Sequence, residues 1–176
     1  LGKPVPRPTF YNNLPYDESH FIKSLEQLTT LIDSANRIFR TIFPCPENLN
    51  TFGFDIRNVL ILSCTEVETQ FVGILRANKI RPRGKYPTTK DYVRLKDVLK
   101  VSEYEVKFNL FPDLPALSPF KEWSKDQPSE SITWYANYND VKHDRDNNFV
   151  PVSTTRRCQR EIKAICLVIC FIRITN

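Results

Sequence analysis

The feature that most constrains this chain is the stretch of residues 18–43, in which apolar residues recur every three or four positions. That spacing places them on one face of an α-helix, so it predicts a long amphipathic helix that must pack against other elements. Asp17 or Ser19 can cap its start, and Pro44 and Pro46 end it, because proline cannot continue a helix. Its apolar residues are Phe21, Ile22, Leu25, Leu28, Leu31, Ile32, Ala35, Ile38, Phe39 and Ile42.

Further stretches have the length and apolar pattern of helices: 55–79, a shorter one that begins at Thr88 or Thr89, 131–146, and 153–174. Within the first of these, residues 59–62 are apolar on all sides, which predicts a central helix. We expect the two long N-terminal helices and the last helix to form the main core. Residues 1–16 predict an extended arm, because four prolines crowd there.

A change of period marks residues 103–110, which alternate strictly between polar and apolar. Such alternation predicts a half-buried strand. A strand needs a partner, and the two candidates are residues 114–120, as the second arm of a hairpin, and the N-terminal arm. We therefore expect a small β insertion over residues 102–120. The side chains expected to share one face are Tyr104, Val106, Phe108 and Leu110.

These elements predict a mainly α fold: a helical bundle of about five helices with a small β-hairpin insertion. The 176 residues fit a single domain over 1–176, since a chain of this length can bury a core without disulfides or metals. Five cysteines without a CxxC pair, and two histidines far apart in sequence, argue against a zinc site, so neither metal nor cofactor is expected.

The same composition bears on location. An odd number of cysteines suggests free thiols and a reducing compartment. The longest apolar run, 164–172, has nine residues, far fewer than the roughly 20 that span a bilayer, and no N-terminal signal pattern is visible. We therefore expect a cytoplasmic protein without a membrane partner.

Positive charge is concentrated between residues 76 and 100, where nine basic residues face only two acids. This local excess is larger than the net charge of +5 of the whole chain. A basic stripe of this kind can attract phosphates, and Arg81, Arg83 and Lys85 are the residues expected to contact the phosphates of a nucleic acid. The alternative is an ordinary solvated helix face with the loop that precedes it.

The predicted helix over 131–146 carries the densest set of aromatic, amide, imidazole and charged groups in the chain. Asn139 and His143 are four positions apart and share one helix face, as do Asp140 and Asp144. A polar face that packs needs partners, and the central helix offers Glu68, expected to point inward while Glu66, about 200° away, points outward.

This helix resembles the HEPN (higher eukaryotes and prokaryotes nucleotide-binding) family of bacteria. The similar residues are Trp134-Tyr135, Tyr138-Asn139 and Val141-Lys142-His143-Asp144-Arg145, then Asn147, Asn148, Phe149 and Thr154-Thr155. The resemblance covers the two C-terminal helices, and the upstream bundle only by helix pattern. It implies a helical bundle and, as in many of these proteins, a metal-independent endoribonuclease of a defence or toxin–antitoxin system. The partners it implies are RNA, a protein partner or a second copy of the chain.

The family's nuclease motif is an arginine, often followed by a polar residue, with a histidine four to six residues after the arginine. Asn139 matches the polar position and His143 the histidine. Ala136, Asn137 and Tyr138 stand where the arginine is expected. Arg145 or Lys142 could supply the missing cation from the other side of the histidine.

Two hypotheses follow. In the first, His143 moves a proton while the 2′-hydroxyl of RNA attacks its own phosphate, and a cation stabilises the transition state. Asn139 and Arg145 act with the histidine, while Glu68, Lys142, Asp144 and Tyr138 support it. In the second, the chain is a non-catalytic interaction or nucleotide-binding module, and the same groups form a structural polar cluster around His143. The missing motif arginine favours the second hypothesis, whereas the family resemblance and the charged run Lys142-His143-Asp144-Arg145 favour the first.

Overall fold

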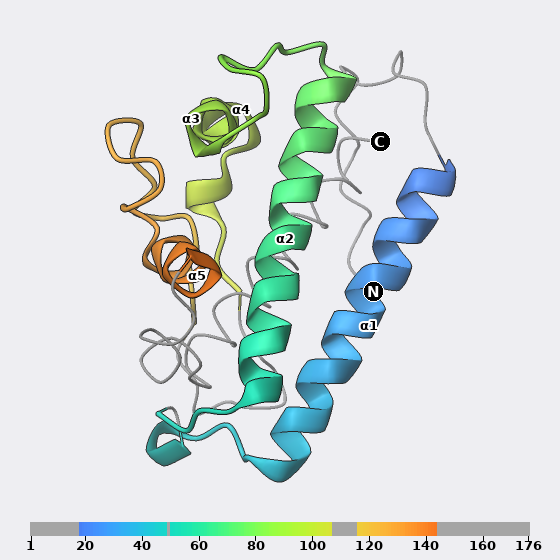
Figure 1. Ribbon diagram of the computed structural model, residues 1–176, viewed down its shortest axis with the longest axis vertical. Coiled ribbons are helices and arrows are strands. Elements are labelled where there is room, and N and C mark those ends of the chain that lie inside the picture. Colours follow the sequence, from blue (N-terminus) through green and yellow to red (C-terminus); the bar gives the residue numbers. More distant parts are fainter. Residues whose placement is uncertain (1–17, 49, 107–115, 144–176) are drawn as a thin grey trace, which may run out of the picture.

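The computed structural model describes residues 18–48, 50–106 and 116–143, and these are mainly helical, as the sequence predicts (Figure 1). The predicted N-terminal arm, 1–16, and the predicted last helix, 153–174, lie outside the described residues, as does Arg145. The arrangement below is therefore that of the two long N-terminal helices and of the segments that pack on the second.

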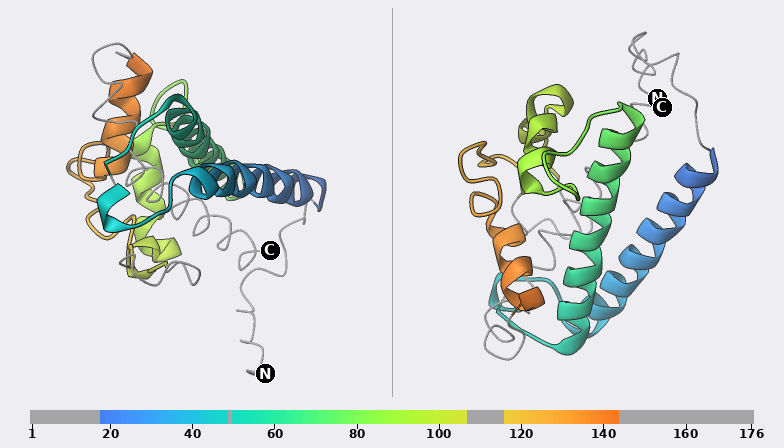
Figure 2. Two further views of the ribbon diagram at one scale, coloured as in Figure 1. Left: turned by 90° about the horizontal axis from the view of Figure 1, so that it is seen from below. Right: turned by 45° about the horizontal axis from the view of Figure 1, so that its top comes forward.

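Two helices of 24 residues, α1 (Glu18–Thr41) and α2 (Phe54–Ala77), lie side by side and antiparallel (Figures 1 and 2). The turn between them includes the short 3₁₀ helix η2 (Pro46–Asn48). Near this turn the helices share a small apolar cluster, consisting of Ala35, Ile38, Phe39, Ile56 and Val59. The apolar faces of both helices are thus buried here, although Ile22 and Leu25 near the start of α1 are almost half exposed.

Toward its other end the α1–α2 contact is polar. The amide of Gln70 donates to the hydroxyl of Ser24, with a distance of 3.1 Å between nitrogen and oxygen, and to the carboxylate of Glu66. All three side chains are buried. Glu66 therefore points toward α1, and the expectation that it points outward is wrong. A central helix has neighbours on more than one side, so 200° of separation leads to a second interface rather than to solvent.

The segment after α2 does not form the single short helix expected from its sequence. It folds as α3 (Thr89–Tyr92), η3 (Val93–Leu95), α4 (Lys96–Leu99) and η4 (Val101–Glu103). Lys100, with φ of 52°, ends the helical run in the left-handed region. A 3₁₀ helix has three residues per turn rather than the 3.6 of an α-helix, so the buried face of the segment shifts where one gives way to the other. Val98, an apolar residue of the expected helix, is consequently 70% exposed.

Of the predicted β insertion over residues 102–120, the structure describes only the two ends, residues 102–106 and 116–120. Val106 and Leu117 form an antiparallel bridge, with N···O distances of 2.8 and 3.0 Å between their backbones. The chain thus folds back on itself as a hairpin would. Glu103 ends a 3₁₀ turn, so extended backbone starts at Tyr104 and not at residue 103. Residues 107–115 lie outside the described part of the chain, and the hairpin there stays a prediction.

The last described element, α5 (Thr133–His143), packs on the side of α2 that faces away from α1 (Figures 1 and 2). The core between α2, α3 and α5 is aromatic. Phe71 of α2 has ring centroids of Tyr92, Trp123 and Phe120 within 5.3–5.9 Å. Trp123 and Trp134 are buried, and each indole donates a hydrogen bond to a proline carbonyl. These contacts fix α5 and the loop before it on α2.

By length and composition, α2 is the one helix in the described residues that could cross a membrane. The core helix of a water-soluble protein passes the same test. Here α2 contacts α1 and α5, and Glu66, Glu68 and Gln70 near its middle are bonded to other side chains. These contacts are those of a central helix, which is the position that its sequence predicts.

Candidate functional site

One carboxylate of α2 holds two tyrosines of α5. The hydroxyl of Tyr135 donates to Oε1 of Glu68, and the hydroxyl of Tyr138 lies 3.4 Å from Oε2, where it makes a longer and weaker bond. Tyr138 is only 2% exposed. The structure thus brings together Glu68 and Tyr138, two of the residues singled out in the sequence. We call Glu68, Tyr135 and Tyr138 the α5 cluster.

Burial raises the pKa of two phenols of this region, those of Tyr135 and Tyr92. It raises the pKa of Tyr135 well above its ordinary value, and the hydrogen bond to Glu68 and the charge of Glu68 act in the same direction. Burial, with the charges of Glu68 and Asp91, raises the pKa of Tyr92 to about 12. Both tyrosines are therefore hydrogen-bond donors at neutral pH. Within the α5 cluster, Tyr135 therefore donates to Glu68 rather than acting as a base.

The exposed part of α5 carries Lys142 and Asn139. The ammonium of Lys142 lies 5.2 Å from the centroid of the Tyr138 ring, and a hydrogen bond to the Tyr138 hydroxyl raises the pKa of this lysine. Lys142 is exposed and stays protonated, whereas Asn139 is half-buried. His143 is the last residue of α5. Its side chain, Asp144 and Arg145 lie outside the described residues, so their expected approach to Glu68 stays a prediction.

A second candidate site lies at the end of α2 that is farther from the α1–α2 turn (Figure 1). Residues 79–88, here called the basic loop, contain Lys79, Arg81, Arg83 and Lys85 and no acid. All four side chains are exposed. The three residues expected to bind RNA thus project from one short connection between α2 and α3.

Asp91 fixes the shape of the basic loop. Its carboxylate accepts the backbone N–H of Arg83 at 2.9 Å and that of Thr88 at 3.1 Å. The second contact belongs to a capping box at the start of α3, in which Thr88 and Asp91 satisfy each other's backbone. Asp91 is 1% exposed. One buried carboxylate therefore ties both halves of the loop to the helix that follows.

Two further contacts hold the same loop. The guanidinium of Arg94 donates to the carbonyl oxygen of Arg81 at 3.2 Å, and the hydroxyl of Tyr92 donates to that of Pro87 at 3.3 Å. Tyr92 belongs to the aromatic core and packs on Phe71. The loop is thus anchored to the interior at both ends, while its basic side chains extend into solvent.

The acids of the segment do not neutralise the loop. Asp91 is paired with Arg94, with 3.9 Å between oxygen and nitrogen, and Asp97 is paired with Lys125, with 2.5 Å between oxygen and nitrogen. The hydrogen bond to Lys125 and the charge of Lys125 hold the pKa of Asp97 below its ordinary value. Within the residues that the structure describes, Arg81, Arg83 and Lys85 take part in no ion pair. Their charges remain available for an anion.

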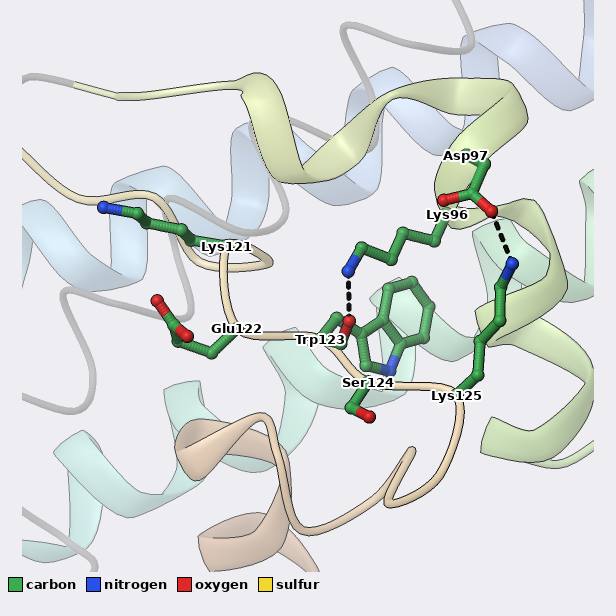
Figure 3. Close-up of a pocket in the computed structure, with 7 residues that line it drawn as sticks. All are labelled: Lys96, Asp97, Lys121, Glu122, Trp123, Ser124 and Lys125. Atoms are coloured by element: carbon green, nitrogen blue, oxygen red, sulfur yellow. Dashed lines mark hydrogen bonds and ion pairs between the residues drawn. The ribbon is translucent and has the colours of Figure 1, made fainter.

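A shallow hollow of about 450 Å³ opens where α4 meets the loop before α5 (Figure 3). Lys96 extends across it and donates to the carbonyl of Trp123, and Lys125 reaches the carboxylate of Asp97 from the opposite side. Lys121 lies at its rim. The sequence does not predict that Lys121 and Lys125 lie near the basic stripe, because they are 20 residues or more beyond it.

Sequence reasoning also missed Asp91 and Tyr86. The signal for Asp91 was present, since Thr88 and Asp91 have the spacing of a capping box. Tyr86 is 68% exposed and lies in the basic loop between Lys85 and Pro87. In the described part of the chain, no group of three or more His, Cys, Asp or Glu side chains could hold a metal ion.

Comparisons of this chain with models of protein families, with curated proteins and with solved structures find no match. Of the two regions described, the α5 cluster is engaged in internal hydrogen bonds. The basic loop presents exposed charges on a backbone that Asp91, Arg94 and Tyr92 hold in place.

Proposed function

We propose that this chain is a HEPN-like helical protein that binds RNA through the basic loop. The observation that carries the proposal is the loop's combination of four exposed basic side chains, no acid and a backbone anchored by Asp91, Arg94 and Tyr92. An RNA strand carries one negative charge per nucleotide, so a compact group of cations matches its backbone.

The fixed backbone supports this assignment. A mobile loop would lose conformational freedom on binding, at a cost in affinity, whereas a loop already held in place loses less. Arginine adds a planar, fork-shaped donor set that matches phosphate oxygens. Arg81 and Arg83 bracket Pro82, whose ring restricts the backbone further. The loop is therefore preorganised to present its two arginines together.

Charge reversal tests the proposal. The variant Arg81→Glu, Arg83→Glu, Lys85→Glu should bind a fluorescently labelled RNA at least about tenfold more weakly than the wild type, because several phosphate contacts are replaced by repulsion. The matched control is Lys23→Glu, Arg37→Glu, Arg40→Glu on α1, which changes the net charge equally at three exposed positions. It should retain most of the affinity. Equal losses in the two variants would mean that only net charge matters, and would refute a site at the loop.

The hypothesis that the α5 motif cuts RNA has less support than binding. Ala136, Asn137 and Tyr138 stand where the motif arginine is expected, and Tyr138 is buried and bonded to Glu68. We therefore expect the purified protein to bind RNA without cleaving it. Incubation with total RNA, beside a His143→Ala variant, tests this: cleavage that the variant lacks would assign a nuclease to α5, whereas no cleavage by either protein agrees with binding alone.

A further inference from the structure

Tyr86 differs from the tyrosines that surround the core. Its side chain is 68% exposed, whereas Tyr92, Tyr135 and Tyr138 are between 2% and 8% exposed. It directly follows the last basic residue of the basic loop, and the ammonium of Lys85 is 5.3 Å from the centroid of its ring. An aromatic ring is therefore presented to solvent among the cations proposed to contact phosphates.

The backbone around Tyr86 is as well anchored as the rest of the loop. Pro87 follows it and restricts Tyr86 to extended conformations. The carbonyl of Pro87 accepts the Tyr92 hydroxyl, and the next residue, Thr88, donates its N–H to Asp91. The backbone that carries the ring is thus fixed, so a flat ligand that stacks on the ring does not have to order the loop first.

We propose that the ring of Tyr86 stacks on an unpaired base, and that the ligand of the basic loop is therefore single-stranded RNA. This inference rests on the proposed function. Lys85, whose ammonium lies over one face of the ring, would hold a neighbouring phosphate while the base stacks on the other face. In a duplex the base faces are covered by neighbouring bases, so a lone protruding tyrosine finds nothing to stack on.

A protein surface is the other ligand that an exposed tyrosine suits. The surroundings of Tyr86 favour the nucleic acid, because residues 79–88 carry four positive charges and no acid. Interface cores in protein complexes are depleted of lysine, of which the loop has two, whereas sites for single-stranded nucleic acid combine basic side chains with aromatic platforms.

The test uses one RNA of about 12 nucleotides, alone and annealed to its complement, with the wild type, Tyr86→Ala and Tyr86→Phe. The wild type should bind the single strand about tenfold more tightly than the duplex. Tyr86→Ala should lose about tenfold in single-strand affinity and leave duplex binding unchanged, and Tyr86→Phe, which keeps the ring, should bind as the wild type does. Melting temperatures verify that each variant is folded.

Phe54→Ala is the matched control. Phe54 is 63% exposed and lies below a cation, with Arg57 5.4 Å from its ring centroid, but it begins α2 at the end opposite the basic loop. This variant should bind like the wild type. Equal affinity for single strand and duplex, with no effect of Tyr86→Ala, would overturn the inference and leave RNA binding standing. No affinity for either RNA at low salt would overturn both the inference and the proposed function.

Discussion

The direction in which Glu68 points could be predicted from the sequence, whereas that of Glu66 could not. Its spacing with Cys64, Phe71 and Leu75 predicts that it faces inward, and the structure confirms a partly buried carboxylate that accepts bonds from α5. The same reasoning fails for Glu66, because periodicity identifies the buried side of a helix only when there is one such side. A helix with neighbours on two sides buries both carboxylates, and sequence alone does not say how many neighbours there are.

Removing Glu68 should destabilise the fold. In Glu68→Ala the hydroxyls of Tyr135 and Tyr138 lose their acceptor while they remain buried, at a cost of about 1–3 kcal/mol in the free energy of unfolding. At about 2–4 °C per kcal/mol, thermal unfolding should show a clear drop. Glu26→Ala, at an exposed position of α1, is the control and should change the melting temperature little. A drop of equal size in both variants would rule out a specific role for Glu68.

Tyr92 predicts a loss of stability in alkali. Its pKa is raised from 10.0 to about 12 in the folded protein, so the folded state binds the phenolic proton more tightly than the unfolded chain does. This contribution is fully present below the unfolded pKa of 10.0 and is lost as the pH rises through about 12. Tyr92→Phe removes the titrating group and also the bond to Pro87, which costs about 1 kcal/mol at neutral pH.

Urea unfolding of the wild type and of Tyr92→Phe at about pH 8 and about pH 11 measures this effect. The wild type should lose more stability between the two pH values than the variant does, because only the wild type has this proton to release. Tyr135 is present in both proteins and contributes equally to both. Parallel losses would mean that Tyr92 titrates as it does in the unfolded chain.

At the scale of elements, the long helices were predictable, and of the short helical segment only its start was, since α3 begins at Thr89 with Thr88 as its N-cap. The helices α1, α2 and α5 begin within two residues of the expected positions, since a sustained apolar period and proline boundaries define them. The stretch 89–103 breaks into short helical turns instead. Its backbone follows contacts that are remote in sequence, such as the bond between Thr89 and Ser129, whose oxygens lie 2.6 Å apart. Such contacts leave no periodic signal.

Two substitutions separate the effect of the loop's fixed backbone on RNA binding from the effect of its charge. Asp91→Ala and Asp97→Ala each remove one negative charge from the same segment. The first also frees the backbone N–H groups of Arg83 and Thr88, at a cost of about 2 kcal/mol in stability. If a fixed loop matters, Asp91→Ala weakens RNA binding although it makes the protein more positive.

Asp97→Ala is the control for that experiment. Asp97 is exposed and bonds to Lys125, so its removal releases a cation and leaves the loop intact. We expect RNA affinity equal to or above that of the wild type. Stronger RNA binding by both variants would show that charge alone determines affinity, and that the geometry around Asp91 has no part in it.

At the scale of the whole molecule, α2 is the axis on which the described parts are arranged (Figure 2). One side carries α1, the other carries α5, and the end beyond Ala77 carries the basic loop. Tyr92 connects the two candidate regions, since it bonds to Pro87 of the loop and lies within the electrostatic reach of Glu68. The mainly helical class was predictable from periodicity. The single domain, the last helix and the place of His143 stay predictions, because they depend on residues outside the described part.

The dependence of RNA affinity on salt tests the central claim most directly. Binding to single strands weakens with salt in proportion to the phosphates contacted, with a slope of about 0.7 per contact in a plot of the logarithm of Kd against that of salt concentration. If Arg81, Arg83 and Lys85 each hold one phosphate, replacing all three by Gln should lower this slope by about 2. A variant that binds RNA with the slope of the wild type would contradict the assignment of the basic loop as the RNA site.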